Sequence, residues 1–261
     1  DFGETGDYGE WKPIEYSGTY GTNGFYLPFK QDYTVEGFSA VTYRGTGATQ
    51  YIGGTGFQPD FTWIKQRSGT QGHNIQDAIR GTSKILTSNA TAAEWTDTNR
   101  VTSFNSDGLS LGTDSAINAS GSTYVAWNWD MGGSNATNTN GSINSTVRAN
   151  PTYGQSIVSY TGNGSANQTV GHGLSAIPEL VIIKAREYAS GSWTVYHSFS
   201  SGNPSSMFLN STGATESGSG GTSTTSVIGI QTGTATGGDS TNRNNEGFIA
   251  YCFHSVTGYS K

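Results

Sequence analysis

The stretches YVAWNWDMGG (residues 124–133) and FIAYCFHSVTG (residues 248–258) decide the fold prediction. Each alternates large apolar residues with other residues, as a β-strand with two different faces does. Phe248 follows Tyr124 by 124 residues in a chain of 261 residues. Two versions of one strand at such a distance predict an internal duplication.

The composition favours an all-β protein. Aromatic residues make up 12% of the chain and charged residues also 12%, whereas disordered chains usually combine few aromatics with a high net charge. Aromatic and β-branched residues separated by Gly, Ser, Thr and Asn are typical of many short strands. The net charge of −6 excludes the basic surface that nucleic acid requires. Membrane insertion is not predicted, because no apolar run approaches the roughly 18 residues of a membrane helix.

Two copies can be aligned over residues 38–133 and 153–261. The landmarks that they share are a tyrosine, a proline and a lysine at corresponding places: Tyr43 and Tyr160, Pro59 and Pro178, Lys65 and Lys184. Each copy ends with one of the two strands quoted above. Copies of this length fit β-sandwiches of ordinary size. The predicted fold class is therefore all-β, with two tandem antiparallel β-sandwich domains.

The remaining segments are predicted to lie outside the two copies. Residues 1–37 align with neither copy, so they form an N-terminal strand pair or the remnant of a preceding domain. Residues 134–152 are almost free of apolar residues and contain Pro151, so they predict a polar linker or a long surface loop.

The alternation within each copy predicts which side chains face a core. In YVAWNWDM we expect Val125, Trp127, Trp129 and Met131 to point inward, and Tyr124, Ala126, Asn128 and Asp130 to point outward. The nearly continuous apolar runs FTWIK and LVIIK predict central strands. SFNSDGLSLG predicts a hairpin that turns at Asp107-Gly108. HNIQDAIRG has some helical character, but its counterpart WTVYHSFSSG has strand character, so we predict strands for both.

The sequence contains no catalytic pattern, which predicts a protein that is not an enzyme. There is no H-E-x-x-H zinc motif and no G-x-S-x-G nucleophile elbow. Glycoside hydrolysis needs two carboxylates that face each other, and the acidic residues lie instead in turns and polar tails. The single cysteine, Cys252, excludes an intrachain disulfide and is expected to be a buried, inert thiol.

Calcium is the candidate cofactor, because Ca²⁺ takes oxygen ligands from Asp, Asn, Glu and carbonyl groups in loops. The loop GGDSTNRNNEG (residues 237–247) supplies Asp239, Asn242 and Glu246 as candidate ligands, and NSDG (residues 105–108) is a second such loop. The alternative, that both loops are ordinary turns without metal, is favoured.

Exposed tryptophans are candidates for sugar binding, because an indole ring stacks on the apolar face of a sugar while nearby polar groups bind its hydroxyls. Trp95 lies in the polar stretch AAEWTDTNR, and Trp193 lies in the second copy. Asn105 and Asp107 are candidate polar partners. The alternative is that these tryptophans pack beneath loops.

Five phrases carry a family resemblance: EYSGTYGTNGFYLPF, TSFNSDGLSLG, YVAWNWDMGGS, SYTGNGSANQTVGHGLSAIPELVIIKAR and FIAYCFHSVTGYSK. They resemble virion appendage proteins of tailed bacteriophages, particularly phages of marine bacteria. The resemblance covers nearly the entire chain and implies concanavalin A-like (laminin-G-like) sandwich modules on the virion surface, outside the cell. It supplies no catalytic residues. Fibres of this kind are often trimeric, so a homotrimer is a candidate assembly.

Three functions remain after this reading. The first is a non-enzymatic fibre or appendage protein that attaches to host-surface glycans. The second is a structural decoration protein of the capsid or tail that binds other virion proteins. The third, a polysaccharide-degrading enzyme, is disfavoured because it needs a pair of carboxylates across a groove. We take the first as the prediction and keep the second as its alternative.

Overall fold

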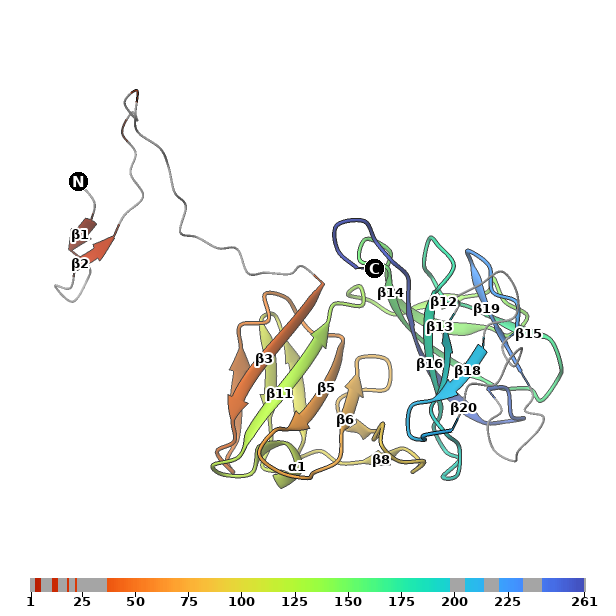
Figure 1. Ribbon diagram of the computed structural model, residues 1–261, viewed down its shortest axis with the longest axis horizontal. Coiled ribbons are helices and arrows are strands. Elements are labelled where there is room, and N and C mark those ends of the chain that lie inside the picture. Colours follow the sequence, from red (N-terminus) through yellow and green to blue (C-terminus); the bar gives the residue numbers. More distant parts are fainter. Residues whose placement is uncertain are drawn as a thin grey trace. The chain divides into compact units, whose positions relative to one another are not determined.

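The computed structural model describes residues 3–5, 11–13, 18, 22, 37–197, 205–213, 221–231 and 241–260, and these form an all-β protein with several antiparallel sheets (Figure 1). The chain divides into two units, Asp1–Tyr33 and Thr34–Lys261. The first unit contains two strands that pair antiparallel, β1 (Gly3–Thr5) and β2 (Trp11–Pro13). A strand pair was one of the two predictions for residues 1–37. All further description concerns the second unit.

In residues 38–133, which we call the first repeat, two sheets pack on one core. The first sheet has four strands in the order β3 (Phe38–Arg44), β11 (Thr123–Trp129), β5 (Phe61–Gln66) and β6 (Asn74–Asp77). The other has three, in the order β4 (Gln50–Gly53), β10 (Gly108–Leu111) and β9 (Val101–Asn105). Side chains from both sheets form one buried cluster: Ile52, Ile64, Val101, Leu109, Leu111, Ile117, Tyr124 and Ala126. The arrangement is sandwich-like.

The second repeat, residues 134–260, is built on a sheet of seven strands. Their order is β12 (Ala136–Asn138), β13 (Ser145–Asn150), β14 (Gln155–Thr161), β20 (Gly247–Phe253), β16 (Leu180–Ala185), β17 (Thr194–His197) and β18 (Ser205–Phe208). A strand pair, β15 (Gln168–Gly171) with β19 (Val227–Ile230), packs on this sheet. Residues of the sheet and of the pair form one buried cluster, the core of the second repeat, which includes Val158, Ile183, Phe248, Val170, Ile228 and Ile230. Short elements elsewhere are the strand pair β7 (Lys84–Ile85) and β8 (Trp95–Thr96) and the helix α1 (Ser115–Asn118).

The strand order supports the internal duplication. The sequence β3-β11-β5-β6 in the first sheet corresponds to β14-β20-β16-β17 in the seven-stranded sheet. Tyr43 lies opposite Tyr124 in one copy and Tyr160 lies opposite Phe248 in the other, and both ring pairs stack with centroids 5.1 Å apart. The two stretches that suggested a duplication therefore occupy the same place in their sheets, β11 and β20.

Residues 134–152 do not form the predicted linker. They contain β12 and β13, and β13 pairs along its length with β14, from Ser145 opposite Tyr160 to Asn150 opposite Gln155. Within β13, Val147 reaches the core of the second repeat, and Ser145 is buried with its hydroxyl bonded to the carbonyl of Gly171. Backbone pairing with β12 on one side and β14 on the other, together with the apolar contact of Val147, holds this polar strand, which side-chain composition does not reveal.

The prediction of the inward face of β11 was wrong for three of its four residues. Tyr124, Ala126 and Asn128 are the fully buried ones, while Val125, Trp127 and Trp129 are half-buried on the opposite face. Asn128 is tolerated in the core because it accepts from Thr62 Oγ1 at 2.9 Å and donates to the carbonyls of Ala126 and Ser39. Met131, beyond the strand, is buried as expected.

Other strand predictions are confirmed. β9 and β10 form the expected hairpin, but its turn lies one residue earlier than predicted: Ser106 and Asp107 form the turn, and Gly108 (φ 145°) opens β10 opposite Asn105. β5 and β16 are interior strands, and both β6 and β17 are strands over the ranges given above. Cys252 is completely buried, and burial raises the pKa of its thiol to about 12, as expected for an inert cysteine.

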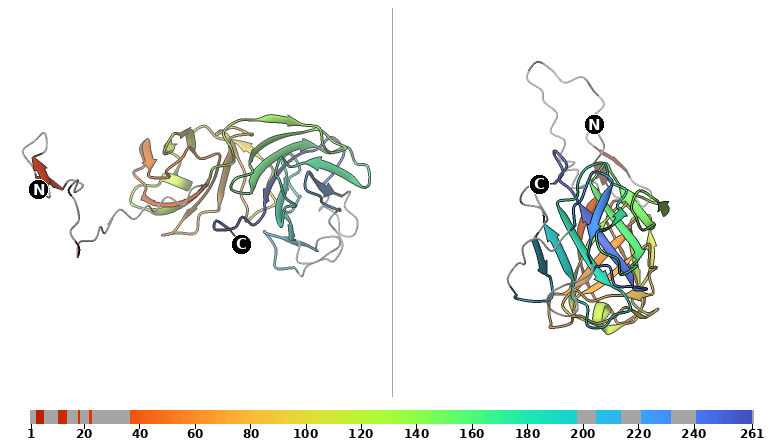
Figure 2. Two further views of the ribbon diagram at one scale, coloured as in Figure 1. Left: turned by 90° about the horizontal axis from the view of Figure 1, so that it is seen from above. Right: turned by 90° about the vertical axis from the view of Figure 1, so that its right-hand side faces the viewer.

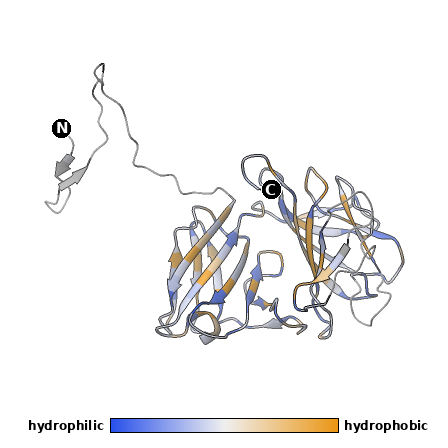
Figure 3. Cartoon of the chain, in the orientation of Figure 1, coloured by the Kyte–Doolittle hydropathy of each residue, from blue (hydrophilic) through white to orange (hydrophobic). Residues whose placement is uncertain are grey.

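The two repeats share a third hydrophobic cluster, which we call the shared core. Half of its buried members come from the first repeat and half from the second: Phe61, Ile75, Leu86 and Met131 with Ile157, Trp193, Ile249 and Tyr251. Phe61 stacks on Tyr251 with ring centroids 4.2 Å apart. Figure 2 shows the two repeats side by side, and Figure 3 shows apolar residues along the strands of both. The repeats are therefore one packed body.

A polar network crosses the same interface. Arg80 of the first repeat is buried and binds Asp77 at 2.6 Å and Glu94 at 3.2 Å. Tyr251 of the second repeat donates to Asp77 at 2.7 Å, and Arg186 binds Glu94 at 2.8 Å. Burial opposes the charge on Glu94, but the two arginines outweigh it, so the pKa of Glu94 is lowered.

Candidate binding cavity between the repeats

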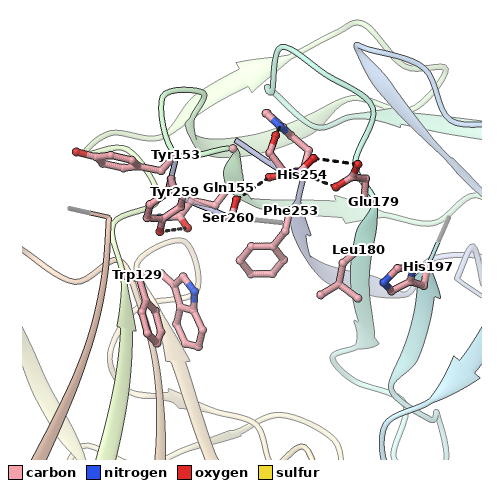
Figure 4. Close-up of a pocket in the computed structure, with 13 residues that line it drawn as sticks. Trp129, Tyr153, Gln155, Glu179, Leu180, His197, Phe253, His254, Tyr259 and Ser260 are labelled. Carbon is pink, nitrogen blue, oxygen red and sulfur yellow. Dashed lines mark hydrogen bonds between the residues drawn. The ribbon is translucent and has the colours of Figure 1, made fainter. Parts of the chain in front are cut away.

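A cavity of about 640 Å³ opens where the first repeat meets the second, and its lining comes from both (Figure 4). Its walls are the outer faces of the two large sheets, the faces turned away from the core of each repeat. Strands β3 and β11 provide Phe38 and Trp129, which lie opposite each other in register. Strands β16, β17 and β20 provide Leu180, His197 and Phe253. These three residues lie side by side, because Leu180 is paired with His197 on one neighbouring strand and with Phe253 on the other.

Aromatic rings dominate these walls. Trp129 lies 5.0 Å from Phe38 and 6.4 Å from Phe253 between ring centroids, so one indole bridges the two repeats. Tyr153 and Tyr259 form a second pair at 5.1 Å on the rim. Figure 4 shows Trp129 on one side of the cavity and Leu180 and His197 on the other. A flat ligand with apolar faces can pack against such walls.

The polar rim is held in place by hydrogen bonds. Gln155 is buried and donates to the carbonyl of Gly37 (2.7 Å), directly before the first repeat, and to that of Asp130 (2.6 Å) within it. Its Oε1 accepts from the Tyr259 hydroxyl at 3.2 Å. Burial raises the pKa of Tyr259 to about 12, so this hydroxyl stays protonated and keeps its donor role at neutral pH.

Glu179 is the one acidic residue in the described lining of the cavity. One carboxylate oxygen accepts from the Ser255 amide at 2.8 Å and the other from the Ser255 hydroxyl at 3.1 Å. A carboxylate oxygen can accept more than one hydrogen bond, so Glu179 is still able to bind ligand hydroxyls. The nearby His254 is fixed through its Nδ1, which lies 2.8 Å from the carbonyl of Ser255.

The cavity has the properties of a small-ligand site. Such sites typically measure about 300–1,000 Å³ and combine apolar or aromatic walls with a few placed polar groups. The aromatic walls and the Glu179, Gln155 and Tyr259 rim fit this description. The described lining holds one carboxylate, Glu179, whereas glycoside hydrolysis uses a pair.

Most residues predicted as ligand contacts have structural roles. Trp193 is completely buried in the shared core, and its indole donates to the carbonyl of Thr87 at 2.7 Å, so it cannot stack on a ligand. Trp95 is half-buried on β8, with the guanidinium of Arg100 5.2 Å from its ring centroid. Neither residue lines the cavity.

The predicted polar partners stabilise the β9–β10 hairpin and a neighbouring loop. Asn105 donates to the Ser110 hydroxyl at 2.9 Å. Asp107 accepts from the amides of Gly56 (2.7 Å) and Gly54 (3.2 Å), and these bonds lower its pKa. Neither side chain lies in the cavity lining.

The candidate calcium ligands are not brought together as a metal site in the part of the chain that the structure describes. Asp239 lies outside the described residues. Asn242 accepts from the Asn163 amide at 2.9 Å, and Glu246 accepts from the amides of Glu187 and Tyr188, each at 2.7 Å. Among the described residues no group of three or more His, Cys, Asp or Glu side chains could hold a metal ion.

The residues of the cavity were not predicted from the sequence. Trp129 was expected in the core of its own repeat, and for Phe253 a strand was predicted but not the face to which its side chain points. The sequence held only a partial signal: Tyr124 on one face of YVAWNWDM and Trp127 and Trp129 on the other are all large, which fits partners on both faces of the sheet but does not say what these partners are.

The fold and the cavity together define an all-β protein of two fused repeats with a ligand-sized site between them. The family described as "Domain of unknown function (DUF7483)" matches residues 34–261, and the chain belongs to this family. The match spans both repeats as one domain, in agreement with the shared core. No curated protein and no solved structure matches the chain. No helix among the described residues is long and apolar enough to cross a membrane.

Proposed function

We propose that this protein is a non-enzymatic module of a tailed-phage virion appendage that attaches to host-surface glycans through the cavity between its repeats. The observation that carries the proposal is the aromatic cavity of about 640 Å³, with Trp129 bridging Phe38 and Phe253. Sugar rings present apolar C–H faces and a circumference of hydroxyls, which match aromatic walls and a polar rim. The place on the virion surface rests on the sequence resemblance described above.

The finer fold assignment is part of the same proposal. We infer that each repeat is a concanavalin A-like, jelly-roll sandwich, in line with the family resemblance. Support comes from the shared strand order of the two large sheets and from the packing of a second layer on each. On this view the sandwiches are a rigid frame, and the ligand binds where the two frames meet.

Glycan binding is tested by a glycan-array screen of the purified protein, followed by titration of the sugars that bind. Replacement of Trp129 by alanine is expected to weaken binding at least about tenfold, equivalent to ~1.4 kcal/mol. Because Trp129 also packs on Phe61 at 4.7 Å, a milder variant is needed. Glu179→Gln, which keeps the shape of the side chain, is expected to weaken binding without unfolding the protein.

Trp95→Ala is the matched control, since Trp95 is a half-buried tryptophan outside the cavity. Equal loss of binding in the Trp95 and Trp129 variants would contradict the assignment of the site. If no glycan binds while the protein still associates with purified virion parts, the alternative of a structural decoration protein replaces the proposal.

A further inference from the structure

The two repeats have equivalent outer sheet faces, which differ in how far they are buried. Tyr251 of β20 lies between Ile157 and Ile182 of its neighbouring strands, and Trp127 of β11 lies between Ala40 and Trp63 in the same arrangement. These are therefore equivalent positions on the outer faces of the two large sheets. The exposure of equivalent residues on the two faces can therefore be compared.

In the second repeat this face is covered by the first repeat. Ile157 and Ile249 are 0% exposed and Tyr251 is 1% exposed, all within the shared core. Lys184 is also buried there, with its ammonium bonded to the carbonyl of Thr91 of the first repeat at 3.1 Å. An outer sheet face of this protein is thus built to receive a repeat.

In the first repeat, none of the described residues covers the equivalent face in this way. Ala40 and Thr42 are exposed, and Trp63, Val125 and Trp127 are half-buried. We call these five residues the acceptor face. It is continuous with the shared core, because Phe61 and Trp129 lie on the same side of the first sheet. Two tryptophans in edge contact, with centroids 6.5 Å apart, form its centre.

The matching donor surface is also visible in the first repeat. There the segment beside β6 places Leu86 opposite Ile75, and Leu86 is completely buried in the shared core. In the second repeat β18 runs beside β17, and Met207 lies opposite Val195, which is the equivalent of Ile75. Met207 therefore occupies the place of Leu86.

Within the described part of the chain, this second donor surface does not lie against another repeat. Met207 is half-buried, and Leu209, two residues further on the same side, is 41% exposed, among the most exposed large apolar residues of the described chain. We call Met207 and Leu209 the donor edge. As far as the structure describes the chain, the acceptor face of the first repeat and the donor edge of the second are both left without a covering repeat.

We propose that a second copy of this protein occupies the acceptor face, with its donor edge placed there as the Leu86 segment is placed on the second repeat. The contact is heterologous, because the two surfaces differ, and it repeats head to tail from molecule to molecule. Such contacts close into a ring or continue as a filament, depending on the rotation between copies. The inference rests on the internal duplication and does not depend on glycan binding.

The test is sedimentation analysis of the full chain from low micromolar to several hundred micromolar concentration. We expect the average mass to rise with concentration above that of one chain. Trp127→Asp, Thr42→Arg and Leu209→Asp are each expected to weaken self-association at least about tenfold. Thr42 and Leu209 are exposed, so their variants should fold even if Trp127→Asp does not. Ile177→Asp, which replaces another exposed apolar residue (46%), is the matched control and should change nothing.

A mixture of Thr42→Arg and Leu209→Asp proteins gives the sharpest result. Each variant keeps one working surface, so the mixture should form dimers and no longer assemblies. The inference is wrong if the wild-type protein stays at the mass of one chain at every concentration, or if self-association survives in both variants. A monomer that binds glycans at Trp127 would show a sugar as the occupant and would equally overturn it. None of the substituted residues lines the cavity, so glycan binding by these variants reports on the proposed function separately.

Discussion

Replacement of Trp193 by alanine is expected to lower the free energy of unfolding by about 3–5 kcal/mol, the usual cost of deleting a large aromatic side chain from a core. Trp193 is 0% exposed, lies among residues of both repeats and donates to the carbonyl of Thr87 across the interface. Truncation leaves a cavity in the shared core and a carbonyl without its donor. Urea unfolding followed by circular dichroism measures the change.

Two comparison variants show the source of this effect. Trp193→Phe keeps most of the apolar volume and loses the bond to Thr87, so it should cost less than the alanine variant. Trp95→Ala removes a half-buried ring that packs over Arg100 within the first repeat, and it should cost less again. Equal effects of Trp193→Ala and Trp95→Ala would contradict a shared core centred on Trp193.

Replacement of Arg80 by methionine is expected to lower the free energy of unfolding by about 3–5 kcal/mol, because removing one partner of a buried ion pair leaves a charge without compensation. Arg80 and Asp77 both have side chains that are 0% exposed. The carboxylate of Asp77 would keep the Tyr251 hydroxyl but lose its cation, and Glu94 would keep only Arg186. Because Arg80 helps to lower the pKa of Glu94, that pKa should rise in the variant.

The direction of the pH dependence follows from Glu94. A carboxyl group whose pKa is lowered by folding contributes stability above its unfolded pKa, and this contribution is lost as the pH falls through the folded value. The wild-type protein should therefore lose more stability than Arg80→Met on acidification. Lys84→Met is the control, since Lys84 makes an exposed bond to Thr96, and a change within about 0.5 kcal/mol is expected. An Arg80→Met protein as stable as this control would refute the buried network.

The sequence predicted strands, hairpin and duplication well because these depend on local patterns. Alternation in YVAWNWDM and FIAYCF reports a strand whatever covers it, and Asp107-Gly108 marks the turn to within one residue through backbone preference alone. The equivalence of β11 and β20 follows from the same residues, Tyr124 and Phe248. Such signals need no knowledge of distant parts of the chain.

The orientation of β11 could not be predicted in the same way. Alternation shows that two faces differ but not which one points into a given core, and here both faces meet apolar partners. The face with Tyr124, Ala126 and Asn128 packs within its repeat, whereas Trp129 packs across the interface. The polar Asn128 is tolerated inside because its amide oxygen accepts from Thr62 and its amide nitrogen donates to the carbonyls of Ser39 and Ala126. Choosing the more apolar face as the inner one therefore gave the reverse of the observed arrangement.

The candidate site was unpredictable because it forms only when the repeats dock. Phe38 and Trp129 are 91 positions apart, and Phe253 follows Trp129 by 124 positions. Trp95 was chosen for the polar sequence around it, and that criterion selects turns as readily as binding sites. Glu179 carries no sequence signal, since it lies between Pro178 and the apolar run of β16.

The most direct test of the central claim is nuclear magnetic resonance of the tryptophan indole groups during titration with a sugar selected on the glycan array. We expect the Trp129 indole signal to shift with the ligand, while the signal of Trp193, buried and bonded to Thr87, stays in place. Shifts at Trp129 that saturate with the same dissociation constant as binding would establish the cavity between the repeats as the glycan site. Shifts at Trp95 or Trp127 without any at Trp129 would contradict that assignment.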